Sequence, residues 1–274
     1  MAEAVSPRWL GRSRTGERTL DTAARLWFIV AVIGQWAFVY YIAAFYAGPT
    51  LQGRFETWNR KDLIMGYVAG DHVGNLYFAA HVLMAALITT SGALQLFPQI
   101  RARAISFHRW NGRLYVLTAF LMAIGGLWLV WVRGTYLTLY GAAGSTVLAL
   151  LIMTCAAMTL RHALARKIDI HRRWALRTFL VANGVWFQRI GYMAWIILNR
   201  GPVGIGKHMD GPFDILWGFG AFLLPLAVLE IYMRVRDQGS AVAKSVTATA
   251  VFVLTAVMGV GIIGAYMIMW RPLL

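Results

Sequence analysis

Two histidines in this sequence belong to copies of the same short motif. The pattern R-x-I-x-x-H-R ends at His108-Arg109 and again at His171-Arg172, 63 residues later. Two neutral imidazoles on facing helices can ligate a b-type haem, and nearby cations can pair with its propionates. The repeated motif therefore predicts a haem b site, with the two histidines as axial ligands and the two arginines beside them. The alternative interpretation is that both histidines only cap or hydrogen-bond the starts of their helices.

A second group of polar residues lies within apolar stretches. Arg189 and Gln188 fall about fifteen residues into one such stretch, and His81 falls near the start of another. A charge inside the hydrocarbon layer is costly unless it is paired or hydrated, so these residues predict a site for a small anionic or lipid-like substrate, with Asp71 and His72 just above it. The alternative for Arg189 is that its long side chain reaches the outer interface.

Other chemistry finds little support in the sequence. It contains none of the common hydrolase, metalloprotease or nucleotide-binding motifs, and no metal site is expected. Its one cysteine, Cys155, excludes an intrachain disulfide. Whether the protein is an enzyme is left open, because any reaction would have to use a cofactor or its histidines and arginines.

The elements that position these residues are membrane helices. The chain is 59% hydrophobic and 14% charged, and its mean hydropathy is +0.60. Apolar runs of about 20 residues are long enough to cross a bilayer as helices. The net charge of +15 comes from basic residues between these runs rather than from one patch, which argues against nucleic acid as a partner. We therefore expect an all-α polytopic transmembrane bundle with about seven spans, at 24–47, 76–97, 114–132, 139–160, 174–198, 212–233 and 246–270.

The orientation follows from the distribution of Lys and Arg, which cytoplasmic loops retain. Sixteen of these residues lie in the N-terminal tail and the loops of one side, and seven lie on the other side. This predicts a cytoplasmic N-terminal tail at 1–23, a single transmembrane domain at 24–274 and an external C-terminus. The expected location is the inner (plasma) membrane, with anionic lipid head groups attracted to the basic side. Glu230, with Arg234 and Arg236 beside it, predicts an ion pair at that side.

The longest external stretch, 48–75, has a mixed-charge composition. It includes Trp58, Lys61 and Asp62. Two interpretations stay open: a solvated connector, which is the usual state of a polar loop, or a segment that folds over the mouth of the bundle.

The repeated motif also indicates an internal duplication. A spacing of 63 residues is about two helices with their turns, so the second to fifth spans, at about 76–198, are expected to be a duplicated helical hairpin with both copies in the same orientation. In such a four-helix arrangement alternate helices are diagonal, which would let His108 and His171 face each other.

These segments resemble a known family. The sequences that carry the resemblance are His108-Arg109-Trp-Asn-Gly112-Arg113-Leu-Tyr115 and His171-Arg172-Arg-Trp174-Ala-Leu-Arg177, together with His81 and Gln95. They are similar to a bacterial membrane-protein family catalogued as domain of unknown function 2306. The resemblance implies a topology and candidate positions, but no reaction.

The paired histidines are also similar to the diagonal histidines of cytochrome b561-like bundles. The facing half of the fourth span has no histidine to pair with His81, so a second haem is not expected. Three functions stay open: an accessory subunit of a larger membrane complex, a b-type haem electron-transfer protein, and a protein that binds or transports a small anionic or lipid-like substrate.

Overall fold

The structure is a computed structural model that describes residues 10–60 and 66–274, with side chains described from Gly16 onward. Arg8, Lys61 and Asp62 lie outside the described residues. The described chain is helical and contains no strand, which confirms the all-α prediction. Its α-helices are α1 Leu10–Ile42, α2 Gly48–Leu51, α3 His72–Leu96, α4 Pro98–Arg103, α5 Ile105–Trp131, α6 Leu139–Leu164, α7 Ile168–Ala182, α8 Gly184–Leu198, α9 Pro212–Gln238 and α10 Ala241–Gly264.

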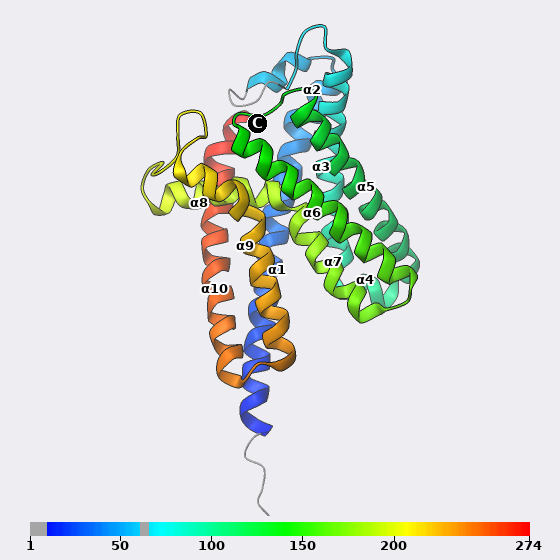
Figure 1. Cartoon of the computed structure of the whole chain (residues 1–274), viewed down its shortest axis with the longest axis vertical. Helices are drawn as coiled ribbons and strands as arrows, with labels where there is room; N and C mark the ends of the chain where they lie inside the picture. Colours follow the sequence, from blue (N-terminus) through cyan, green and yellow to red (C-terminus); the bar gives the residue numbers. More distant parts are fainter. Residues whose placement is uncertain (1–9, 61–65) are drawn as a thin grey trace, which may run out of the picture.

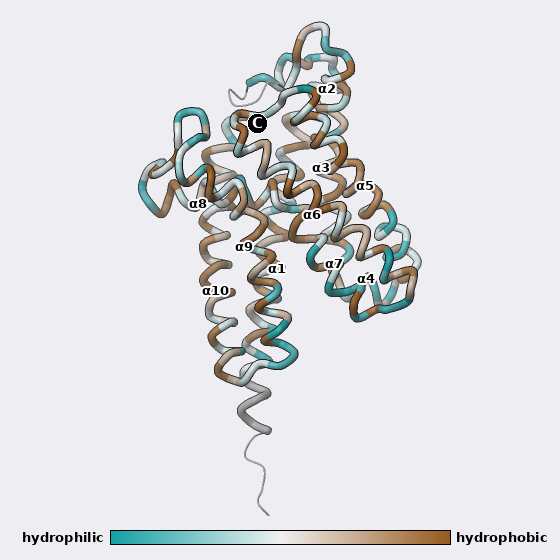
Figure 2. The backbone as a smooth tube through the Cα atoms, viewed as in Figure 1, coloured by the Kyte–Doolittle hydropathy of each residue, from teal (hydrophilic) through white to brown (hydrophobic). Residues whose placement is uncertain are grey.

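Six helical stretches of the described chain are long and apolar enough to cross a membrane. They correspond to α3, α5, α6 and α9, and to α1 and α10 with their extensions. Figure 2 shows hydrophilic residues gathered in the loops at the two ends of the molecule and hydrophobic residues between them. This pattern suits a bilayer, where each helix satisfies its own backbone hydrogen bonds. The protein is thus a polytopic helical bundle, as expected.

The span predicted at 174–198 is two helices rather than one. Asn183 ends α7, and its side-chain Nδ2 donates to the carbonyl oxygen of Phe179 at 2.7 Å. Helices α7 and α8 have 15 residues each, or about 22 Å, which is shorter than the hydrocarbon layer of ~30 Å. Figure 1 shows α8 turning away from the direction of α7 to lie across α9 and α10. The dipeptide Asn183-Gly184 is a turn signal that the length of the apolar run obscured.

The long helices form two groups that meet along α8 (Figure 1). Helices α3, α5, α6 and α7 form one group, in which consecutive helices pack side by side and α5 lies diagonally from α7. Helices α1, α9 and α10 form the other. Close packing joins the groups where Gly144 of α6 meets the backbone of Gly218 in α9, since a Cβ at Gly144 would come within 2.9 Å of the Gly218 carbonyl oxygen.

The duplicated hairpin is visible in the helices themselves. The isoleucines of the two motif copies, Ile105 and Ile168, are the first residues of α5 and α7. Seven residues beyond each histidine lie Tyr115 and Thr178, and the Tyr115 hydroxyl donates to the Thr178 carbonyl oxygen at 3.4 Å. Equivalent positions of the two copies therefore meet between the diagonal helices.

The ends of the helices place the basic segments together. Figure 1 shows that the start of α1, helix α4, and the turns after α6 and α9 lie toward one end, while the chain finishes at the opposite end. Helix α1 begins at Leu10, inside the segment predicted as a tail, so the helix extends well beyond the apolar span. Which end faces the cytoplasm stays a prediction from the charge distribution.

The segment before α3 packs onto the bundle instead of forming a solvated connector. Trp58 is buried, and it contacts Phe78 of α3 and Leu129 of α5. Arg133, at the end of α5, donates to the Asp71 carboxylate at 3.0 Å and to the Asn75 side chain at 2.9 Å. Its side chain is only 7% exposed. Asp71 and Arg133 thus fasten this segment to the ends of both helices.

Protonation of the Asp71 carboxylate is expected to lower the stability of the folded protein in acid. Its pKa lies below the ordinary value of 3.8, first because the Gly74 backbone N–H donates to it and then because of Arg133. A lowered pKa means that the stabilisation is complete above the ordinary value and is lost as pH falls through the folded-state pKa. We expect Asp71→Asn, which keeps a helix-capping acceptor, to lower the melting temperature at pH 6 and to flatten its fall below pH 4.

The measurement is thermal unfolding in detergent between pH 2.5 and 6. Glu56→Gln is the matched control, because Glu56 is an exposed carboxylate of the same segment. Equal acid sensitivity of Asp71→Asn and the wild type would show that the ion pair is not the origin of the effect.

Candidate functional site

Arg189 lies on α8 inside the bundle, with no carboxylate partner among the described residues. Its Nη1 donates to the carbonyl oxygen of Val185 at 3.1 Å, and its guanidinium group lies over the ring of Phe38 at 5.5 Å from the centroid. Val185 is one turn earlier on α8, so the side chain points away from the Leu198 end of the helix.

Two tyrosines of the first span face the same guanidinium. Tyr41 and Tyr46 both lie within electrostatic range of Arg189, and their side chains interact with each other. The helix between them is π-helical, at Ala43–Ala47. Because π-helical hydrogen bonds link residues five apart, this segment brings two side chains five positions apart onto one face. Such segments are rare and often occur at functional sites.

His81 of α3 completes the group. It also lies within electrostatic range of Arg189. Its ring rests on Gly125 and Gly126 of α5, where a Cβ at Gly126 would be 3.3 Å from His81 Cε1. The Nδ1 atom of His81 is buried and has no hydrogen-bond partner among the described residues. We call Arg189, His81, Tyr41, Tyr46 and Phe38 the Arg189 site.

More buried polar atoms without partners occur in the aromatic core near this site. Trp270 is fully buried and packs on Phe38 and Tyr41, with its Nε1 unpartnered within the described chain. Gln35, one turn before Phe38 on α1, is 0% exposed, and neither atom of its amide has a partner there. Buried polar groups are normally hydrogen-bonded to protein, water or ligand. These atoms therefore indicate that this core accommodates water or a small polar ligand.

The structure places some of the residues predicted for this site close together and others apart. His81 and Arg189 come together as expected. The backbone carbonyl oxygen of Gln188 accepts a hydrogen bond from Trp217 Nε1 at 3.1 Å, on the side of α9. The expected approach of Asp71 is wrong, since its carboxylate pairs with Arg133. Tyr41 and Tyr46 were not foreseen, because the sequence pattern does not reveal the π-helical turn at Ala43–Ala47, which brings Tyr46 to the same face as Tyr41.

The histidines of the repeated motif also come together. His171 lies within electrostatic range of His108. The Nδ1 atom of His171 is 3.0 Å from the carbonyl oxygen of Thr159. The Nδ1 atom of His108 is buried without a partner among the described residues, and its backbone carbonyl accepts from Gln95 Nε2 at 3.0 Å. The contact of Tyr115 with Thr178 fills the space between the two helices farther into the bundle.

The cations near these histidines are not all available to a ligand. Arg109 and Arg172 are exposed. Arg177 makes two hydrogen bonds to the Glu230 carboxylate, at 2.6 and 2.9 Å. The prediction that Glu230 pairs with its neighbours Arg234 or Arg236 is therefore wrong, because α7 packs beside α9 and presents a closer guanidinium.

Fold and site together define a polytopic α-helical membrane protein that encloses an arginine within its bundle. Residues 78–233 match the family described as "Predicted membrane protein (DUF2306)", and the chain belongs to this family. No curated protein and no solved structure matches the chain. The comparisons give no support to the similarity with cytochrome b561-like bundles.

Because Arg189 has no carboxylate partner among the described residues, we can predict the effect of removing its charge. A charge held away from water without a partner carries a desolvation cost of several kcal/mol, which an apolar group of similar size does not carry. We expect Arg189→Met to leave the melting temperature in detergent unchanged or to raise it by a few degrees when no anion is added. A fall of several degrees would show that the guanidinium is satisfied by the protein alone.

Proposed function

We propose that this protein binds a small anion, or the anionic group of a lipid-like substrate, at the Arg189 site. The observation that carries the proposal is the guanidinium of Arg189, which lies within a membrane bundle and has no carboxylate partner among the described residues. A charge in this position is stabilised by an opposite charge or by water. An anion supplies the missing charge and accepts several hydrogen bonds.

The neighbours of Arg189 suit an anion rather than a cation. Tyr41 and Tyr46 have hydroxyl groups that donate hydrogen bonds, and His81 can donate from a ring nitrogen. No Asp or Glu is among the groups that act electrostatically on Arg189. The site is therefore positive, with neutral donors around the charge.

A chain of aromatic contacts connects this site with the segment that covers the bundle. Tyr46 packs against Phe78, with ring centroids 6.2 Å apart, and Phe78 packs against Trp58 at 5.8 Å. Trp58 belongs to the segment that Arg133 and Asp71 fasten in place. Aromatic packing therefore links the Arg189 site to the segment at the end of the molecule that the charge distribution predicts to be external.

The test compares anions at constant ionic strength. Ligand at one hundred times its dissociation constant stabilises a protein by about 2.7 kcal/mol, so a bound anion raises the melting temperature by several degrees. We expect sulfate, phosphate or acetate to raise the melting temperature of the wild type, relative to chloride, by more than that of Arg189→Gln. Sulfate and phosphate also stabilise proteins without binding, so only the difference between the two proteins counts.

The matched control is Arg200→Gln, which removes the same charge from an exposed position just beyond α8. This variant should respond to anions as the wild type does. The proposal fails if the wild type and Arg189→Gln respond equally to all three anions, or if Arg200→Gln loses the response as well.

A second candidate, binding of one b-type haem by His108 and His171, is favoured by one contact. A metal-ligating histidine commonly donates its other ring N–H to a carbonyl oxygen, and the Nδ1 atom of His171 lies next to the carbonyl oxygen of Thr159. This contact would leave Nε2 of His171 free to bind iron. Arg109 and Arg172 are the cations proposed for the propionates, and Arg101 also lies within electrostatic range of His108.

Absorption spectroscopy tests the haem proposal directly. Protein purified after expression with added haem precursor is expected to show a Soret band, which His108→Ala or His171→Ala should remove. His208→Ala, at an exposed loop position, should retain it. A folded protein without the band under these conditions would exclude this candidate. The role as an accessory subunit and the location in the inner membrane stay predictions from the sequence.

A further inference from the structure

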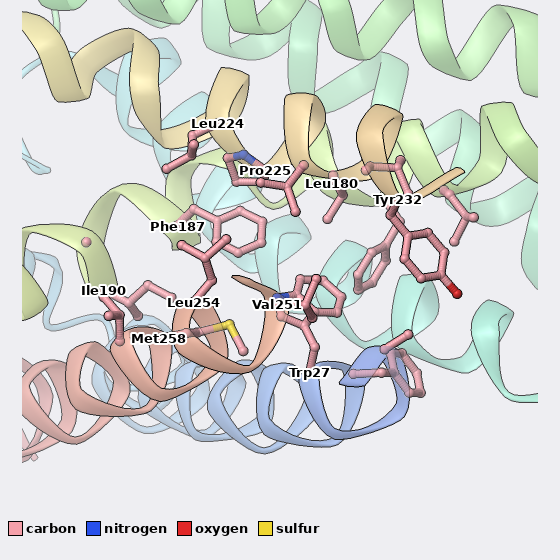
Figure 3. Close-up of a pocket in the computed structure, with 18 of the residues that line it drawn as sticks. Trp27, Leu180, Phe187, Ile190, Leu224, Pro225, Tyr232, Val251, Leu254 and Met258 are labelled. Carbon is pink, nitrogen blue, oxygen red and sulfur yellow. The ribbon is translucent and has the colours of Figure 1, made fainter. Parts of the chain in front are cut away.

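A cavity lies on the other side of α8 from Arg189. Its volume is about 410 Å³, within the range of small-molecule pockets. Side chains from α1, α7, α8, α9 and α10 surround it, so it lies at the junction of the two helix groups. Figure 3 shows Trp27, Phe187, Leu254 and Met258 on one side and Leu224 and Pro225 on the other, directed toward a common space.

The lining of this cavity is almost entirely apolar. It follows one side of α9 from Trp217 to Arg236, which is about 28 Å at 1.5 Å per residue. Leu224 lines the cavity and is 46% exposed, so the cavity borders the lipid-facing surface. A long apolar space of this kind suits an acyl chain.

The charged residues among the lining lie at one end of the cavity. They are Arg101 of α4 and Arg236 of α9. Arg236 is 3.6 Å from Asp21 of α1 and lies over the ring of Tyr232. No ion pair involves Arg101 among the described residues. Glu17, which also lies within electrostatic range of Arg236, is paired with Lys244. The two guanidinium groups and the Asp21 carboxylate therefore leave a net positive charge at this end of an apolar cavity.

We infer that this cavity binds an anionic phospholipid, with an acyl chain along α9 and the phosphate between Arg101 and Arg236. Both arginines belong to segments at the basic end of the molecule, where the phosphates of one leaflet lie in the predicted orientation. A guanidinium group binds phosphate oxygens by paired hydrogen bonds, and the Tyr232 hydroxyl can donate another. A neutral or zwitterionic lipid would fill the apolar part but would lack the net attraction at its head.

Native mass spectrometry of the whole protein measures this preference. The probe is a mixture of equal amounts of phosphatidylglycerol and phosphatidylcholine with identical acyl chains. Each basic residue near a membrane surface strengthens binding to anionic lipid, and two of them give a preference of about tenfold or more. We expect the wild type to prefer phosphatidylglycerol over phosphatidylcholine by at least that ratio. The variant Arg101→Gln/Arg236→Gln should lose most of this preference.

Matched variants separate this site from the general positive charge of the same end. Arg103→Gln/Arg234→Gln removes two exposed arginines from the same two helices, and it should keep the preference. Equal retention of both lipids by the wild type would overturn the inference. Equal losses in the two double variants would also overturn it, because they would assign the preference to the overall charge.

A third pair of variants tests whether an acyl chain occupies the apolar part. Leu254→Trp fills the cavity, whereas Val253→Trp places the same ring on an exposed face of α10. Only Leu254→Trp should reduce lipid retention, and equal retention by both would contradict binding in the cavity. None of these variants alters Arg189, so the anion response proposed above can persist or fail independently.

Discussion

A bilayer supplies no water to hydrate a charged side chain, so each buried charge must find its partner in the protein or in a ligand. Arg177 meets this constraint through Glu230, which joins α7 to α9. Arg189 has aromatic rings, hydroxyl groups and a histidine around it, but no carboxylate among the described residues. The helices α1, α3 and α8 are arranged around this guanidinium, and the proposed function follows from it.

Irregular helix geometry makes this arrangement feasible. The π-helical segments Ala43–Ala47 and Ala265–Trp270 directly follow α1 and α10, and Asn183 interrupts the helical path between α7 and α8. Irregular backbone at membrane depth is tolerated where protein buries it. In this protein it occurs in the aromatic core around Arg189, where the π-helical segments contain Tyr46 and Trp270 and the interruption at Asn183 precedes α8.

Helix α8 separates the two proposed ligands. One of its faces presents Arg189 to α1 and α3, and another lines the apolar cavity through Phe187 and Ile190. The first site provides a charge with hydrogen-bond donors in an aromatic setting. The second provides an apolar channel with charge only at its end. A protein that binds an anionic group at one site and an anionic lipid at the other would use opposite sides of one short helix.

The helical membrane fold and the position of the repeated motif at the starts of two helices could be predicted from the sequence, because apolar run lengths and repeated motifs are local properties of the chain. The motif did not determine that His108 and His171 lie within electrostatic range of each other. The sequence also showed that the charge of Arg189 falls within an apolar stretch. The folded protein was needed to show that Asp71 pairs with Arg133 and that Tyr41 lies within electrostatic range of Arg189. These contacts join side chains that are far apart in the sequence, and the order of residues along the chain does not reveal which of them come close together in space.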